Sequence, residues 1–185
     1  EDEIIQIGKK TSIDLGIHGL HLELMKMVGR MRYRSSYGQN LLEHSRETAN
    51  MCATMAAELG LNTKYAKRAG LLHDIGKPLS REMEGSHVEL GIELGEKFGE
   101  HPIVQEVIAE HHEDSDRQSP IFFVVKAADI ISSIRPGGRR EDLEGYARRI
   151  MRLEEIANSF DGVKDVFAIN AGREIRVMVQ GEKVG

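Results

Sequence analysis

The chain has 185 residues, of which 40% are hydrophobic and 30% are charged, so it is long enough for a globular domain with a buried core. Its formal net charge of −5 argues against a surface that binds nucleic acid everywhere by charge alone. The single cysteine, Cys52, excludes an internal disulfide and is typical of a reducing compartment, and no apolar run reaches the roughly 18 residues of a membrane-spanning helix.

The first 60 residues predict helices separated by one loop. Apolar residues at 20, 24, 27 and 28 repeat with helical spacing, which indicates an N-terminal helical segment at 1–30. Residues 31–40 are rich in Ser, Tyr, Arg and Gly, and we expect a loop there. A longer amphipathic helix follows from Leu41 to Leu59 and ends at Gly60.

The middle of the chain predicts shorter helices with clear end signals. One helix is expected at about 63–75, with Gly76 as the residue that ends it. The segment Ser86-His87-Val88-Glu89 is a capping box that starts the next helix. Pro102 suits the first turn of a further helix, whose apolar stripe leads to His111.

The C-terminal third changes character. Residues 121–134 are apolar almost throughout; their length favours a helix, whereas their Phe and Val content favours a strand. After a break at 135–138, apolar spacing predicts a long helix at 143–160, and alternating apolar residues around 170–173 predict a β-hairpin. The sequence therefore predicts a mainly α-helical protein with a small α+β appendage, a helix plus a β-hairpin, at 141–185.

Clustered histidines are the most informative feature of the sequence. Six of the eight histidines lie between residues 44 and 112. Imidazole and carboxylate groups together are typical ligands of catalytic transition metals. The candidate ligands are His44, His73, Asp74, His87, His111, His112 and Asp129, whereas His18, His21 and His101 are expected to be structural. We expect one divalent ion, or two, with Mn, Mg, Zn and Fe as the candidate metals.

Most of these ligands also have a purely structural interpretation. His44 lies beside a buried stripe and could be a core histidine, and His87 could simply occupy a helix N-terminus. Asp129 lies in an apolar segment, where a carboxylate is costly unless it is paired with Lys126 or coordinates a metal. If one ion is shared, an Asp129 oxygen and the His73 imidazole must lie within roughly 4 Å, about twice a coordination bond.

Cationic residues supply candidate contacts to a phosphate. Lys77 follows the His73-Asp74 pair and could contact a substrate phosphate as a point charge, or be an ordinary exposed lysine. The stretch from Arg135 to Arg152 contains six arginines and three acidic residues. It is therefore either a polyanion-binding patch or a solvated helix face. The candidate substrate-binding residues are Lys77, Arg135, Arg139 and Arg140.

The order of these residues resembles that of a known superfamily. The pattern His44, His73-Asp74, Asp129 on helices resembles the HD superfamily of metal-dependent phosphohydrolases. Longer strings are similar to the bacterial ribonuclease Y family: RMRYRSSYGQNLLEHS, RAGLLHDIGKP, EGSHVELGIEL, KAADIISSIRPGGRRE and FAINAGREIRVMVQ. This resemblance implies an HD-domain helical bundle at 31–140, followed by the C-terminal region at 141–185.

The resemblance also implies roles for the ligands. His44, His73, Asp74 and Asp129 would hold one metal, and a second would be held by His87, His111 and His112, with Asp74 bridging. The catalytic residues would be His73, Asp74 and Lys77. The implied activity is that of a metal-dependent endoribonuclease that initiates messenger RNA decay, with water as the nucleophile and 5′-phosphate products.

The same resemblance bears on partners and location. Family members carry an N-terminal membrane anchor, a coiled coil and a KH RNA-binding domain. Because this chain begins at Glu1 without an initiator Met, we expect a cytoplasmic fragment of a protein anchored at the cytoplasmic face of the cell membrane. RNA, a second copy of the chain and RNA-degradation proteins are the expected partners, and the fragment itself is expected to make no membrane contact.

Two alternative functions stay open at this point. An HD phosphohydrolase that acts on nucleotides or short oligonucleotides would use the same ligands, and a non-catalytic HD module would serve dimerisation. The cyclic-dinucleotide branch of the superfamily has a Gly-Tyr-Pro element after its paired histidines. Here Glu113-Asp114-Ser115-Asp116 follows them, which argues against that substrate.

Overall fold

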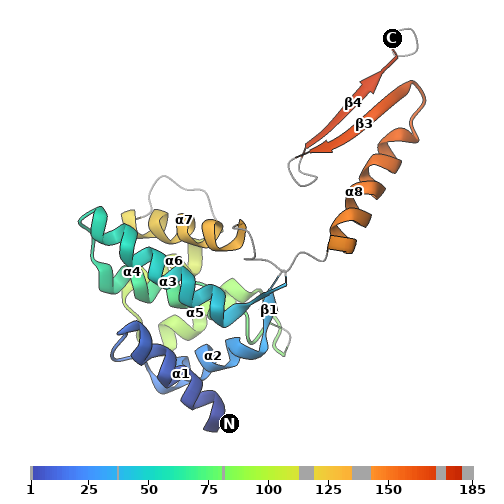
Figure 1. Ribbon diagram of the computed structural model, residues 1–185. Coiled ribbons are helices and arrows are strands. Elements are labelled where there is room, and N and C mark those ends of the chain that lie inside the picture. Colours follow the sequence, from blue (N-terminus) through green and yellow to red (C-terminus); the bar gives the residue numbers. More distant parts are fainter. Residues whose placement is uncertain are drawn as a thin grey trace. The chain divides into compact units, whose positions relative to one another are not determined.

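The computed structural model describes residues 2–36, 38–80, 82–112, 119–134, 143–169 and 174–180, with the backbone alone at 143–149. The chain divides into two compact units, Glu1–Arg140 and Glu141–Gly185, which are drawn in Figure 1 and considered separately below. In the described parts of the chain, no helix is long and apolar enough to cross a bilayer.

The first unit is a bundle of helices. Its elements are α1 (Asp2–Leu15), α2 (Leu22–Arg30), the 3-10 turn η1 (Met31–Tyr33), β1 (Ser35–Ser36), β2 (Gln39–Asn40), α3 (Leu41–Glu58), α4 (Thr63–Leu72), α5 (His87–Lys97), α6 (Pro102–Glu110) and α7 (Pro120–Ile134). Helix α3 packs against both α4 and α7, while α1 packs on α2 and α5 packs on α6 (Figure 1). Helix α4 also contacts α6 and α7, so these helices enclose a single core.

Side chains at the helix starts explain where several helices begin. The Ser86 hydroxyl accepts from Glu89 N while the Glu89 carboxylate accepts from Ser86 N, so the predicted capping box is confirmed. The Nδ1 atoms of His21 and His101 accept from backbone N–H groups at the starts of α2 and α6. His21 also stacks on Phe98, so the structural role expected of these histidines is confirmed.

The apolar stretch at 121–134 is helical, as its length indicated, and not a strand, as its Phe and Val content indicated. In α7, Phe122, Val125 and Ala128 are fully buried in the core. Cys52 of α3 is buried in the same core, and burial raises the pKa of its thiol to about 12.

Two local predictions were wrong. The segment 31–40 is not a plain loop, because η1 leads into the short antiparallel pair β1–β2. Helix α4 ends at Leu72, and turns follow it, so Gly76 does not end a helix. A Cβ at Gly76 would lie 2.0 Å from the His87 carbonyl oxygen. Glycine is needed there because the turn after α4 contacts the backbone of α5.

The second unit comprises α8 (Leu143–Asn158), β3 (Val163–Ile169) and β4 (Glu174–Val179). The two strands pair antiparallel with Val166 opposite Val177, so the predicted helix and hairpin are confirmed. Helix α8 packs on β3, where Val166 is buried and the Glu154 carboxylate accepts from Ala168 N at 2.9 Å. The predicted turn at 170–173 lies outside the described residues. The proposed functional segments 1–30, 31–140 and 141–185 stay predictions.

Candidate metal centre

The seven predicted metal ligands come together from five parts of the first unit. Their ligand atoms form two groups, and within each group all atoms lie within 4.8 Å of one another. The first group is His44 of α3, His73 after α4 and Asp129 of α7; the second is Asp74 after α4, His87 of α5, and His111 and His112 after α6. Sequence distances of up to 85 residues are therefore closed by helix packing.

The first group is arranged around the Asp129 carboxylate. Its Oδ1 lies 3.0 Å from His44 Nε2 and 3.8 Å from His73 Nε2. The second of these distances meets the requirement of about 4 Å for a shared ion. Lys126 lies with its Nζ 5.7 Å from the Phe122 ring centroid, and the Asp129 carboxylate faces the two imidazoles.

Asp74 faces both groups with different oxygens. Its Oδ2 lies 3.3 Å from His73 Nε2 and 3.9 Å from His44 Nε2. Its Oδ1 lies 3.5 Å from His111 Nε2 and 3.8 Å from His87 Nε2. His112 completes the second group, with its Nε2 3.0 Å from His87 Nε2. A carboxylate in this position can bridge two cations.

Three atoms at the centre are buried without a hydrogen-bond partner among the described residues. They are His73 Nε2, Asp74 Oδ1 and His111 Nε2. A buried polar atom without a partner costs about 1–3 kcal/mol, so three of them at one place call for a ligand. A divalent cation satisfies nitrogen and carboxylate oxygen donors together, so the residues present fit a metal.

Backbone carbonyl groups hold the Nδ1 atoms of His73 and His111, on the side of each ring away from the centre. His73 Nδ1 lies 2.8 Å from the Gly70 carbonyl oxygen, and His111 Nδ1 lies 3.1 Å from that of Ile108. A carbonyl oxygen only accepts, so each Nδ1 carries the hydrogen. Each Nε2 therefore directs its lone pair to the centre, as a metal ligand must.

His44 is fixed through a serine hydroxyl. Ser132 Oγ donates to Glu47 Oε2 at 2.6 Å and accepts from Gln39 Nε2 at 3.3 Å. Its one hydrogen is thus used, so it accepts from His44 Nδ1, which lies 3.0 Å away. This arrangement leaves the lone pair of His44 on Nε2, toward Asp129. Sequence patterns do not reveal these three supporting residues, because polar residues such as Ser132, Glu47 and Gln39 are common everywhere in a chain and their contacts join distant segments.

We expect Ser132→Ala to weaken metal binding about 10- to 100-fold, since supporting hydrogen bonds of ligating histidines typically contribute this much. Calorimetric titration of the metal-free chain with Mn²⁺ measures the change. Ser45→Ala is the matched control, because Ser45 is a buried α3 hydroxyl without a hydrogen-bond partner among the described residues. Equal affinity of Ser132→Ala and the unaltered chain would contradict the role given to Ser132.

The electrostatics of the centre suit cation binding. Burial alone would lower the pKa of His73, but Asp74, Asp129 and the Gly70 carbonyl together outweigh burial and raise it. Burial alone would raise the pKa of Asp74, but His73, His111 and Lys77 hold it well below its usual range. For Asp129, burial is outweighed by His44 and His73, and the pKa falls to about 2. Burial lowers the pKa of His87 to about 4, so that imidazole is neutral at pH 7.

Of the predicted substrate contacts, only Lys77 can be placed. Its Nζ lies 2.6 Å from Asp74 Oδ2, and its side chain lines a hollow of about 100 Å³ together with His44 and Asp129. Arg135, Arg139 and Arg140 lie outside the described residues.

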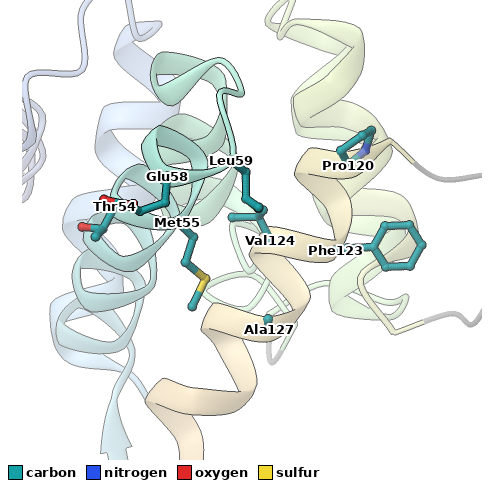
Figure 2. Close-up of a pocket in the computed structure, with 8 residues that line it drawn as sticks. All are labelled: Thr54, Met55, Glu58, Leu59, Pro120, Phe123, Val124 and Ala127. Atoms are coloured by element: carbon teal, nitrogen blue, oxygen red, sulfur yellow. The ribbon is translucent and has the colours of Figure 1, made fainter.

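A separate apolar hollow of about 650 Å³ lies between α3 and α7. Figure 2 shows its lining, which is Thr54, Met55, Glu58, Leu59, Pro120, Phe123, Val124 and Ala127. Glu58 is its only titratable lining residue among those described, and none of the seven ligands reaches it.

Comparison with known proteins agrees with this geometry. The profile of the HD domain family matches residues 41–134, a stretch that contains all seven ligands and half of the chain. This chain belongs to the HD domain family. HD domains bind divalent metals, and the two His/Asp groups of this HD domain are the ones that could hold them.

The matches to curated relatives extend over the whole chain. Ribonuclease Y of Bacillus velezensis is 52% identical over 184 residues, which are 100% of this chain and 36% of the relative. Ribonuclease Y of Bacillus subtilis (strain 168) and that of Bacillus pumilus are each 52% identical, and 35% of each is covered. The chain thus spans about a third of the length of these relatives. No solved structure matches the chain.

Proposed function

We propose that this HD domain is the hydrolytic part of a metal-dependent endoribonuclease that cleaves RNA phosphodiester bonds and initiates messenger RNA decay. The observation that carries the proposal is Asp74, which presents one carboxylate oxygen to each of two ligand groups. The name ribonuclease Y, borne by relatives that are 52% identical, supports RNA as the substrate over nucleotides and over a non-catalytic dimerisation module.

The residues have distinct tasks in this scheme. When bound, divalent ions activate water and offset negative charge on the phosphate. Asp74 holds the two ligand groups in register, and the fixed Nδ1 hydrogens orient His44, His73 and His111. Lys77, next to Asp74 and at the edge of the hollow, contacts a non-bridging phosphate oxygen. Arg135, Arg139 and Arg140 hold the flanking RNA backbone.

The choice of metal follows from the ligands. Five of the seven ligands are imidazoles, a set that favours Mn, Fe or Zn over Mg. We propose two ions, one for each ligand group.

Because water is the nucleophile, cleavage is expected to leave 5′-phosphate and 3′-hydroxyl ends and to tolerate a 2′-O-methyl group at the cleaved position. Mass spectrometry of a single-stranded RNA oligonucleotide, incubated with the chain and Mn²⁺, measures both. A 2′,3′-cyclic phosphate product would reject the scheme. Faster hydrolysis of nucleoside triphosphates or dinucleotides than of long RNA would favour the nucleotide phosphohydrolase instead.

The proposal extends to partners and location. Exposed apolar side chains on α1 (Ile13, 75% exposed) and after α8 (Phe160, 65% exposed) support a homodimer formed through one of these regions. The chain would act in the cytoplasm, as part of a protein anchored at the cytoplasmic face of the membrane, beside other RNA-degradation proteins.

A further inference from the structure

Two larger hollows adjoin the one at the metal ligands. The hollow beside His44 and Asp129 shares Lys77 with a neighbour of about 410 Å³. That neighbour shares Arg34 and Ser35 with a third hollow of about 640 Å³, which is also lined by Arg32, Tyr33, Gly38 and Asn40. Because successive hollows share lining residues, they form one groove that leads away from the metal centre. We call it the η1 groove, after the turn that lines its far end.

The wall of the η1 groove is held in place by hydrogen bonds. Arg34 Nη2 donates to the Lys77 carbonyl oxygen at 2.9 Å, which ties η1 to the turn that carries Asp74. Asn40 Nδ2 donates to the Arg32 carbonyl oxygen at 2.7 Å, and Leu41 N donates to that of Arg34 at 2.9 Å. The cationic side chains are therefore presented from a fixed backbone.

Two arginine side chains line this wall. Arg32, in the middle of η1, is exposed, and Arg34, directly after η1, is partly exposed. Glu82 is an acid that interacts with Arg34, and Arg30 engages both of its carboxylate oxygens. The acid is thus largely neutralised, and an anion near Arg34 meets little repulsion.

Tyr33 adds an aromatic surface between these arginines. Its side chain is 57% exposed and lines the third hollow, while Glu3 interacts with its hydroxyl. An exposed ring flanked by cations is the combination that binds a single-stranded nucleic acid: bases stack on the ring, and phosphates pair with the cations.

We propose that the η1 groove binds single-stranded RNA on one side of the bond to be cleaved, with Tyr33 stacked on a base and Arg32 and Arg34 on adjacent phosphates. The inference rests on the proposed function and adds the path of the substrate to it. An unpaired strand is required, because stacking on Tyr33 needs a splayed base.

Metal-free binding tests the groove. Fluorescence anisotropy of a labelled single-stranded RNA is measured with the whole chain in EDTA, so that no hydrolysis occurs. Tyr33→Ala is expected to bind about tenfold more weakly. Arg32→Ala is expected to weaken binding and to reduce the slope of log affinity against log salt by about 0.7. Arg46→Ala is the matched control, since Arg46 is partly exposed and pairs with Asp14 away from the groove; its affinity and slope should equal those of the unaltered chain.

Three results would overturn the inference: no binding by the unaltered chain, equal affinity for a blunt duplex, or unchanged affinity in both groove variants. Hydrolysis of bis(p-nitrophenyl) phosphate by the unaltered chain with Mn²⁺ tests the proposed function separately. If the unaltered chain hydrolyses the diester but Tyr33→Ala and Arg32→Ala bind RNA as tightly as it does, the groove is rejected and the proposed function is not. Groove-dependent binding with no hydrolysis of the diester or of RNA rejects the proposed function and leaves binding in place.

Discussion

Replacing Asp74 by asparagine is expected to remove bound metal from both ligand groups and to lower RNA hydrolysis about 10³-fold or more, because a catalytic ion supplies several kcal/mol of stabilisation. Asparagine keeps the shape of the side chain but loses the charge that faces His73, His111 and Lys77. Metal content after equilibration with Mn²⁺ is measured by mass spectrometry, and circular dichroism monitors folding.

Single histidine variants decide whether Asp74 bridges. His44 belongs to the first ligand group alone and His111 to the second alone. The variants His44→Ala and His111→Ala are therefore each expected to lose one ion, whereas Asp74→Asn is expected to lose two. His101→Ala is the matched control, because this histidine caps α6 and stacks on Tyr65 away from the centre. One ion in the unaltered chain, or full metal content in Asp74→Asn, would disprove the bridge.

The candidate ligands could be selected because histidines gather between residues 44 and 112 and because Asp129 stands in an apolar helix, where a carboxylate is costly. The adjacent pair His73-Asp74 is common in proteins, and it gains weight only from these neighbours and from the resemblance. Their division into two groups was implied by the resemblance to the HD superfamily alone and could not be worked out from the residues themselves. It depends on α5 and α6 packing on each other on one side of Asp74, and on α3 packing against α7 on the other.

Residues that support the site carried no signal in the sequence. Ser132 matters because α7 places its hydroxyl between His44 and Glu47, which are 88 and 85 positions away. Arg34 was expected in a loop, and its role in holding η1 in place arises from a hydrogen bond to a carbonyl group 43 positions later. Periodicity and propensity describe neighbours in sequence, so contacts of this kind lie beyond them.

The role of Gly76 also depends on a contact between distant residues, and replacing this glycine is expected to have a large effect on stability. Its predicted role was to end a helix, a position that usually tolerates alanine at modest cost. In the structure, a Cβ there would meet backbone atoms of α5, the His87 carbonyl oxygen at 2.0 Å and Gly91 N at 2.7 Å. Gly76→Ala must therefore push α5 away from the turn that carries Asp74. We expect the free energy of unfolding to fall by about 2–3 kcal/mol, as in overpacked cores.

Urea unfolding of the metal-free chain measures that loss, and Mn²⁺ titration measures its consequence for the site. Because His87 moves with α5, the second ligand group should lose affinity while the first keeps its ion. Gly95→Ala on the same helix is the matched control: its Cβ would meet only side-chain atoms, the nearest at 3.5 Å. Since alanine is favoured over glycine within helices by about 1 kcal/mol, this variant should be at least as stable as the unaltered chain. If Gly76→Ala proved as stable as Gly95→Ala, the close packing of the turn on α5 could not be what positions His87 beside Asp74.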